Sequence, residues 1–269
     1  RTANVGLEND IMGKSMKLNL IVATLALVAV SALPAQAQSV ERLDNAITAS
    51  GLTAALPTGF ECVAISSPFG SPYRHDGSTR RGDRNSGLHG GIDLTLKEGT
   101  PLLAVAAGEI VARGEGGQLE GIFIWLRHAP ADTGLPYWVF TKYQHLSVLP
   151  GLNVGDRVRT GQMIAHSGST GTAGKQYGPA GYPHLHLNTL YGRSGEYSMK
   201  GMYNSRVQAD GAVLEDPLIL YLSPIGELSE VRGLSAERRK VVVSVVDEEG
   251  NVHPHGSKAV WPVRCKKKS

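Results

Sequence analysis

The sequence predicts a mainly β protein, with an open antiparallel sheet, few short helices and many tight turns. Glycine accounts for 33 of the 269 residues, whereas aromatic residues make up only 6% of the chain. Short runs rich in Val and Ile alternate with glycine-containing turns, which is typical of short strands joined by hairpins. Hydrophobic residues form 41% of the chain and charged residues 19%, so there is enough apolar material for a substantial core.

Residues 16–37 have the three parts of an export signal. A positively charged start is followed by an apolar stretch over 20–33 and by the small-x-small pattern Ala35-Gln36-Ala37. The apolar stretch is short for a membrane span and no basic stop follows it, which favours cleavage after Ala37 over a membrane anchor. We therefore expect an exported protein, in the periplasm or the extracellular cell wall, with no stable membrane insertion after cleavage.

Changes in composition divide the chain into four regions. Residues 1–37 are upstream sequence and export signal, and residues 38–58 are a short helix and linker. Residues 59–225 contain most of the strand patterns and are the expected main domain. Residues 226–269 form a carboxy-terminal extension, in which the polar turn 247–251 between Val-rich runs predicts a β-hairpin.

Apolar runs cut off by turn residues predict the first strands of the central region. They cover residues 63–65, 101–107, 109–112, 122–126 and 137–143. Residues 151–165 then read as a strand, a turn and a strand, with Val154, Val158 and Ile164 spaced between turn glycines. This segment resembles the hybrid barrels of biotinyl and lipoyl carriers, yet it lacks the lysine that those carriers modify. The sequence therefore predicts a hybrid-barrel core without the carrier function.

Charge and cysteine content narrow the class of protein. The net charge of +3 is too small to indicate nucleic-acid binding, and none is expected. The chain has two cysteines, Cys62 and Cys265, and disulfides persist in exported proteins. A disulfide joining the start of the main domain to the tail and a pair of free thiols are both open at this point.

Two clusters of metal-binding residue types stand far apart in the chain, His89 with Asp93 and His184 with His186. Spacing alone does not single them out, because each pattern occurs twice. The second His-x-x-x-Asp begins at His128, with a proline inside a segment expected to be a mobile loop. The second His-x-His, His253-Pro254-His255, also contains a proline and is expected in an exposed tail.

The neighbouring residues favour the first occurrence of each motif, His89 with Asp93 and His184 with His186. In a straight strand His89 and Asp93 would be about 13 Å apart, too far to share an ion, but Gly90-Gly91 permits a sharp bend. Pro183-His184-Leu185-His186-Leu187 alternates polar and apolar residues, so strand geometry places both imidazoles on one face, about 6.6 Å apart. Hydrogen-bonded strand histidines without a metal are the alternative for both pairs.

A hydrolytic zinc site needs a group that takes a proton from water. Two imidazoles and one carboxylate, with a position left for water, form such a zinc site. The chain has no His-Glu-x-x-His helix that would supply a glutamate base, so histidines are expected in that role. His145 and His184 are the candidates, and His75 and His166 remain unassigned.

The segments carrying these residues resemble the lysostaphin/LytM-type zinc metallopeptidases, which have the duplicated hybrid motif fold and cut peptide bonds in bacterial peptidoglycan. The matching segments occur in the family's order: Ser67-Pro68-Phe69-Gly70, Leu88-His89-Gly90-Gly91-Ile92-Asp93-Leu94, Gly99-Thr100-Pro101, Tyr143-Gln144-His145-Leu146-Ser147, Gly155-Asp156-Arg157-Val158, Ser167-Gly168-Ser169-Thr170-Gly171, Pro183-His184-Leu185-His186-Leu187 and Asp216-Pro217. The resemblance implies that His89, Asp93 and His186 bind Zn²⁺ and that His145 and His184 are the catalytic histidines. It leaves open which of those two is the base.

Two departures from the family pattern concern the surroundings of the site. Asn188 stands where many members have a glutamate, which is expected to weaken the support of a metal ligand. The segment 128–141 is longer than usual, and its aromatic residues Tyr137, Trp138 and Phe140 are expected to form one wall of the substrate groove. Glycyl-glycine bridges and D-alanyl-diaminopimelate links are both open as the cleaved bond.

The resemblance thus predicts an exported, monomeric zinc metalloendopeptidase that hydrolyses peptide crosslinks of peptidoglycan. The alternative function is a non-catalytic cell-wall-binding or amidase-activating module on the same fold. Such modules typically lack some of the metal ligands, whereas His89, Asp93, His145, His184 and His186 are all present in this chain. The sequence therefore favours the enzyme.

Overall fold

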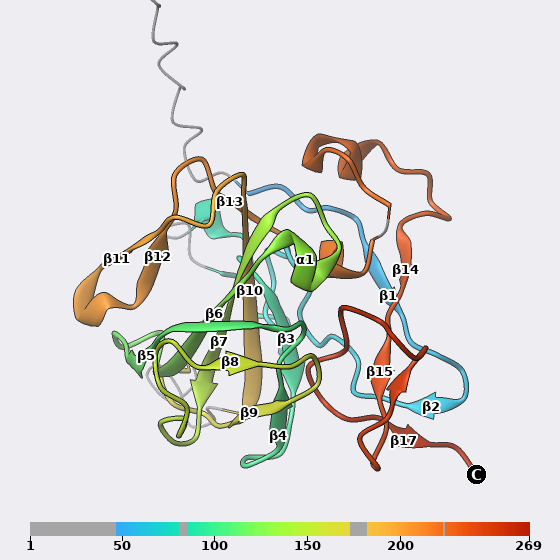
Figure 1. The fold of residues 1–269 in the computed structure, drawn as a ribbon, viewed down its shortest axis with the longest axis horizontal. Helices are drawn as coiled ribbons and strands as arrows, with labels where there is room; N and C mark the ends of the chain where they lie inside the picture. The colour runs from blue at the N-terminus through green and yellow to red at the C-terminus, as the bar shows by residue number, and fades with distance from the viewer. Residues whose placement is uncertain (1–46, 81–84, 173–181, 223) are drawn as a thin grey trace, which may run out of the picture. The chain divides into compact units, whose positions relative to one another are not determined.

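The computed structural model describes residues 47–80, 85–172, 182–222 and 224–269, drawn in colour in Figure 1. These residues belong to one compact unit, Arg42–Ser269. The expected export signal and the helix expected near the start of the 38–58 linker lie outside the described residues. Among the residues that are described, no helix has both the length and the apolar character needed to cross a bilayer.

One seven-stranded sheet forms the centre of the unit, and every neighbouring pair in it is antiparallel. Along the sheet the order is β13 (Val213–Glu215), β10 (His184–Gly192), β7 (Trp138–Leu146), β6 (Ile122–His128), β5 (Gly108–Glu115) and β8 (Arg157–Val158). The seventh strand, β3 (Ile92–Thr95), pairs with the first half of β10. The predicted antiparallel, mainly β fold is confirmed.

Five short strand pairs surround this sheet. Four are antiparallel: β4 (Pro101–Leu103) with β9 (Met163–His166), β11 (Ser198–Lys200) with β12 (Arg206–Gln208), β15 (Val245–Val246) with β16 (Val252–His253), and β17 (Lys266–Lys267) with β2 (Phe60–Glu61). The fifth, β1 (Thr53–Ala55) with β14 (Lys240–Val242), is parallel. The described helices are all short: η1 (Asn85–Gly87), α1 (Pro130–Thr133), η2 (Met202–Asn204), η3 (Pro217–Tyr221) and η4 (Leu228–Gly233).

Apolar side chains pack on both faces of the central sheet. On one face, Leu185 and Leu187 of β10 join Tyr143 of β7 in the main core. On the opposite face, Phe123 and Phe140 belong to a second cluster together with Val207 of β12. Successive side chains of a strand point to opposite faces. When one residue of β10 or β7 is buried on one face, the residues before and after it therefore point to the other face.

The carboxy-terminal extension packs in the same unit as the central sheet. Its strands β14 and β17 pair with β1 and β2 near the start of the described chain. Cys62 and Cys265 form a disulfide, so of the two alternatives left open by the sequence the structure has the bridge. Trp261 is fully buried, and its indole N–H donates to the carbonyl oxygen of Val63 at 2.9 Å. The limits of the regions 59–225 and 226–269 remain proposals.

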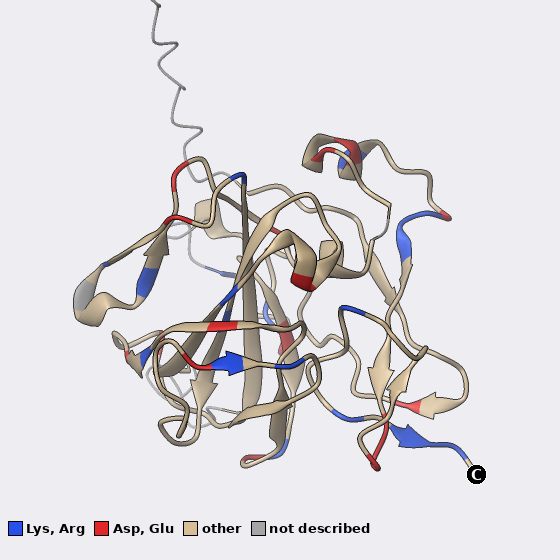
Figure 2. Ribbon diagram, in the orientation of Figure 1, with Lys and Arg blue, Asp and Glu red and all other residues tan. Residues whose placement is uncertain are grey.

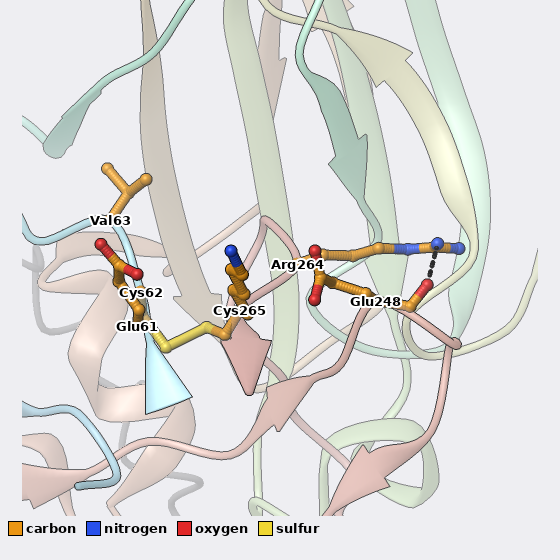
Figure 3. Close-up of a pocket in the computed structure, with 7 residues that line it drawn as sticks. Glu61, Cys62, Val63, Glu248, Arg264 and Cys265 are labelled. Atoms are coloured by element: carbon orange, nitrogen blue, oxygen red, sulfur yellow. Dashed lines mark hydrogen bonds between the residues drawn. A yellow bond between two sulfur atoms is a disulfide. The ribbon is translucent and has the colours of Figure 1, made fainter. Parts of the chain in front are cut away.

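A hollow of about 750 Å³ lies beside this disulfide. Figure 3 shows the bridge and the side chains around the hollow, with Arg264 hydrogen-bonded to the backbone of Glu248. Both charge signs line the hollow, from Glu61 and Glu248 and from Arg264 and Lys266. The same mixture holds along the ribbon in Figure 2, where basic and acidic residues are interspersed, in keeping with the small net charge.

Three sequence predictions about strands are wrong in detail. Residues 63–65 form no strand, because this segment lies against Trp261 instead of pairing in a ladder. In the extension, the turn at 247–251 does join two antiparallel strands, but these are only β15 and β16, since β14 pairs with β1 instead. Val154 lies in a turn and is 60% exposed, outside the strands that it was expected to help form.

We expect loss of the disulfide to destabilise the whole unit. The bridge joins residues that are 203 positions apart, so it removes much conformational freedom from the unfolded chain. Replacing Cys62 and Cys265 together by alanine should lower the free energy of unfolding by about 2–4 kcal/mol, measured by urea denaturation. Val242→Ala, on a side chain that is 70% exposed, is the control and should change it by less than about 0.5 kcal/mol. Equal stability of the double variant and the control would contradict this expectation.

Candidate metal centre

A tight bend joins His89 to Asp93. His89 lies just before β3, where its N–H donates to Ser71 and its carbonyl accepts from Gly70. Gly91 sits so close to β10 that a Cβ added there would lie 2.3 Å from the carbonyl oxygen of Leu187. Only glycine allows this approach of two backbones, so the Gly90-Gly91 pair permits the bend that the sequence predicts.

The pairing of β3 with β10 positions His184 and His186. In the β3–β10 ladder, His186 stands directly opposite Asp93 and His184 opposite Thr95. Leu185 and Leu187 are buried in the main core, and the alternation of the strand therefore turns His184 and His186 to the other face. The period-2 pattern of this segment predicts that arrangement.

Three donor atoms converge at this point. Asp93 Oδ1 lies 2.7 Å from His186 Nδ1 and 3.1 Å from His89 Nε2, and the two nitrogens are 3.0 Å apart. Donor atoms around one tetrahedral zinc, each about 2.0–2.1 Å from the ion, lie about 3.3 Å from one another. The three atoms therefore fit one metal ion of this size, and no other cluster of this kind occurs among the described residues.

Hydrogen bonds around the cluster orient its members. His89 Nδ1 lies 3.0 Å from the carbonyl oxygen of Pro68, which can only accept, so this nitrogen carries the proton and Nε2 presents its lone pair to the centre. Ser67 and Asp93 form an isolated antiparallel bridge, in which the Asp93 N–H donates to the Ser67 carbonyl and the Asp93 carbonyl accepts from the N–H of Ser66. The outer oxygen of Asp93, Oδ2, faces the Arg80 guanidinium at 3.5 Å, which leaves Oδ1 for the metal.

His145 and His184 complete the group, with ring centroids 4.6 Å apart. His145 Nδ1 donates to the carbonyl oxygen of Thr170 at 2.7 Å, and His184 Nδ1 donates to that of Tyr182 at 3.0 Å. Each ring therefore keeps a lone pair on Nε2, and His184 Nε2 lies 3.9 Å from Asp93 Oδ1. His145 has a left-handed backbone, with φ of 64°, a strained conformation of the kind that often occurs at functional sites.

Burial favours the neutral imidazoles of His145, His184 and His186. It lowers the pKa of His186 to about 4, against the opposing effect of the Asp93 carboxylate, and it lowers the pKa of His145 and of His184 as well. Burial would raise the pKa of Asp93, but its close contacts with His89 and His186 hold it well below its usual value. Neutral imidazoles and an ionised carboxylate are the states that bind a metal or accept a proton.

The two alternative motifs, His128 with Asp132 and His253 with His255, form no metal site in the described part of the chain. His128 is fully buried, and its two ring nitrogens contact the carbonyl of Ala107 at 2.7 Å and the Thr141 hydroxyl at 2.8 Å. The mobile loop expected there is wrong, because β6 ends at His128 and α1 begins two residues later. His253 lies in strand β16 instead of an exposed tail, and its Nε2 pairs with the buried Asp247 at 2.8 Å.

The two departures from the family pattern have different outcomes. Asn188 donates from Nδ2 to the carbonyl oxygen of Gly90 at 2.8 Å, so it supports the bend beside His89. The expected aromatic wall is wrong for Tyr137 and Phe140, which are 3% and 0% exposed and belong to the two cores. Trp138 is partly buried under the guanidinium of Arg127.

Sequence reasoning missed the contribution of three residues next to the cluster. Ser67 lies in the recognised Ser67-Pro68-Phe69-Gly70 segment, which could have pointed to it, but no role followed from the motif. Arg80 and Tyr182 stand in loop sequence without periodicity, and no signal in the sequence marks them. His75, left unassigned, lies against Tyr182, with ring centroids 3.4 Å apart and ring planes tilted by 36°.

Residues 87–197 match the profile of peptidase family M23. The chain contains a peptidase M23 domain. This confirms the resemblance drawn from the sequence, and the matched range includes all five of the clustered residues His89, Asp93, His145, His184 and His186.

Curated relatives share this domain with the chain. The glycyl-glycine endopeptidase ALE-1 of Staphylococcus capitis is 39% identical over 106 residues, which are 39% of this chain and 25% of the relative. Lysostaphin of Staphylococcus simulans is 38% identical over 106 residues, 39% of this chain and 19% of the relative. The cell division protein DipM of Caulobacter vibrioides is 31% identical over 145 residues, 52% of this chain and 21% of the relative. The chain thus spans a quarter or less of the length of these proteins.

Two solved structures are similar to parts of the chain. The catalytic domain of the antimicrobial peptidase lysostaphin from Staphylococcus simulans is 28% identical, with a TM-score of 0.37, over 54% of this chain and 87% of that one. LytU is 26% identical, with a TM-score of 0.38, over 56% of this chain and 84% of that one.

We expect the Asn188 amide to contribute to metal binding through Gly90. Asn188→Ala removes the donor that holds the Gly90 carbonyl, and loss of such a supporting contact typically weakens metal affinity about 10-fold. Competition with a chromophoric zinc chelator measures the effect. Asn153→Ala, on the exposed loop before β8, is the matched control and should leave the affinity unchanged. Equal affinities for the two variants would show that Asn188 does not support the centre.

Proposed function

We propose that this protein is an exported zinc metalloendopeptidase that hydrolyses peptide crosslinks of bacterial peptidoglycan. The convergence of His89 Nε2, Asp93 Oδ1 and His186 Nδ1 within an M23 domain carries the proposal. Two imidazoles and one carboxylate are the donor set of a hydrolytic zinc site. ALE-1, which is named a glycyl-glycine endopeptidase, supports a peptide crosslink as the substrate class.

The chain's own residues would hold the metal and move the protons. When bound, zinc would polarise the peptide carbonyl and favour ionisation of water. His145 and His184 present the lone pair of Nε2 toward the centre because each Nδ1–H is bonded to a backbone carbonyl. One of them would accept the proton of the attacking water at Nε2, and as an imidazolium it would donate a hydrogen bond to the developing oxyanion and then give the proton to the leaving amine. The other would orient the water by accepting a hydrogen bond at its own Nε2.

Contacts with neighbouring strands hold His145 for this task. The Thr170 carbonyl accepts from His145. The Thr170 hydroxyl donates to the carbonyl oxygen of Leu146 and accepts from the N–H of Ile122. Gly121 packs against Thr170 so closely that a Cβ added to it would lie 2.2 Å from the Thr170 carbonyl oxygen. The acceptor of the His145 proton is thus fixed to the ends of β6 and β7, as a preorganised catalytic group requires.

The disulfide and the relatives support the proposed location. A Cys62–Cys265 bridge persists in an oxidising compartment, such as the periplasm or the outside of the cell. Relatives named lysostaphin, ALE-1 and a cell division protein are consistent with work on the cell wall. We propose that the mature protein acts there as a monomer, without nucleic acid and without stable membrane insertion.

Metal analysis and wall digestion together test the proposed function. The purified protein should bind about one zinc per chain and release new peptide ends from peptidoglycan, and mass spectrometry of the fragments identifies the cleaved bond. Peptidoglycan with glycyl bridges and peptidoglycan with direct diaminopimelate crosslinks should be digested in parallel. Zinc binding without new peptide ends from either substrate would instead support the non-catalytic wall-binding or amidase-activating alternative.

The two kinds of histidine should respond differently to replacement. His89→Ala removes a proposed ligand and is expected to abolish stoichiometric zinc binding along with activity. His145→Ala should retain zinc and lose about 10²–10⁴-fold in kcat, because it removes only a proton-transfer group. Zinc content by atomic spectroscopy and hydrolysis of a soluble crosslink peptide measure both effects. His255→Ala, an exposed histidine of the extension, should behave as wild type, and full turnover by His145→Ala would refute its proposed role.

A further inference from the structure

A row of rings leads from the loop 72–80 to the centre of the site. His75 lies 3.4 Å from Tyr182, Tyr182 lies 4.5 Å from His184, and His184 lies 4.6 Å from His145, measured between ring centroids. His75 is exposed and Tyr182 is partly buried, whereas His184 and His145 are buried. The row therefore begins in solvent and ends at the two histidines proposed to move protons.

Tyr182 restrains His184 through two contacts of different kinds. Its ring plane lies 16° from that of the imidazole, so the two rings are stacked face to face. Its backbone carbonyl accepts the Nδ1–H of the same imidazole at 3.0 Å. The hydrogen bond sets the direction in which Nε2 points, and the stacked ring limits the tilt of the imidazole plane. Together they leave His184 little freedom to turn.

The loop 72–80 contacts Tyr182 through His75. The backbone N–H of Arg74 donates to Ser78 at 2.8 Å, and its guanidinium donates to the carbonyl oxygen of Thr79 at 2.6 Å. Asp76 accepts from both the backbone N–H and the hydroxyl of Ser78. These bonds hold the turn that carries His75, and the loop lies outside the residues matched to the peptidase family.

The end of the same loop is attached to the metal cluster. Arg80 donates to the Ser67 hydroxyl at 2.9 Å and pairs with Asp93 Oδ2 at 3.5 Å. One turn therefore places His75 against Tyr182 at its tip and Arg80 against Asp93 at its end. Its position relative to the site is set at two separate points.

From this geometry we propose that Tyr182, held by His75, is a positioning residue that orients the imidazole of His184 for proton transfer. The inference rests on the proposed function, in which His184 handles a proton. A group that transfers a proton must point its nitrogen at the reacting atom, and misplacement by about 1 Å can cost about 10²-fold in rate. The aromatic ring of Tyr182 performs this task, and its hydroxyl does not.

Substitutions at Tyr182 separate orientation of His184 from substrate binding. With a soluble crosslink peptide as substrate, Tyr182→Ala should lower kcat about 10–100-fold, with KM changed less than about 3-fold and zinc content unchanged. Tyr182→Phe keeps the ring and should restore kcat to within about 2-fold of wild type. His75→Ala should lower kcat by a smaller factor, about 3–10-fold, because the stacked pair of Tyr182 and His184 remains. His255→Ala is its matched control and should leave kcat unchanged.

Histidine NMR of the metal-free protein gives a readout that does not depend on turnover. The ring current of Tyr182 should displace the imidazole proton signals of His184, so Tyr182→Ala should shift them and Tyr182→Phe should not. If the wild-type protein cleaves no peptidoglycan, the proposed function fails, while these signals still decide whether Tyr182 orients His184.

Three results would overturn the proposal. Unchanged kcat in Tyr182→Ala would mean that the stacking has no effect on the reaction. A rise in KM alone would place Tyr182 in substrate binding, and equal loss in Tyr182→Phe and Tyr182→Ala would assign the effect to the hydroxyl.

Discussion

The antiparallel pairing of β10 with β3 and β7 is the constraint on which the candidate site depends. One edge of β10 brings His186 opposite Asp93, and the other edge brings it opposite Gln144, the residue before His145. A shift of either pairing by one residue would turn the affected side chains to the opposite face of the sheet. The burial of Leu185 and Leu187 opposes such a shift, because it would expose both side chains. The apolar core thus keeps the polar site in register.

Residues outside the recognised peptidase domain also contact the candidate metal centre. The segment 62–68 begins at the disulfide to Cys265, passes the indole of Trp261 and ends with the hydrogen bonds that orient Asp93 and His89. The carboxy-terminal extension is therefore connected to the proposed ligands by a short stretch of chain with a covalent anchor. Loop 72–80 adds a second support through Arg80 and His75. An M23 domain limited to residues 87–197 would lack both of these contacts.

Part of the site could be predicted because its signals are local. The alternation around His184 and His186 and the bend at Gly90-Gly91 are properties of a few neighbouring residues, and the structure has both. His128 shows the limit of such signals, because Pro130 suggested a mobile loop. The histidine is instead buried at a strand end, with hydrogen bonds to Ala107 and Thr141 from other strands. No local pattern contains those partners.

The sequence by itself determined the mainly β fold, the five residues that cluster in the structure and the resemblance of the domain that contains them to a known peptidase family. These follow from alternation, turn chemistry and ordered motifs, all of which depend on residues close together in the chain. Only the tertiary structure decided that Cys62 is bonded to Cys265, that Tyr137 and Phe140 are core residues, and that Tyr182 stacks on His184. Each of these depends on packing between segments distant in the chain, where the burial of apolar surface and the pairing of buried polar groups select the partners.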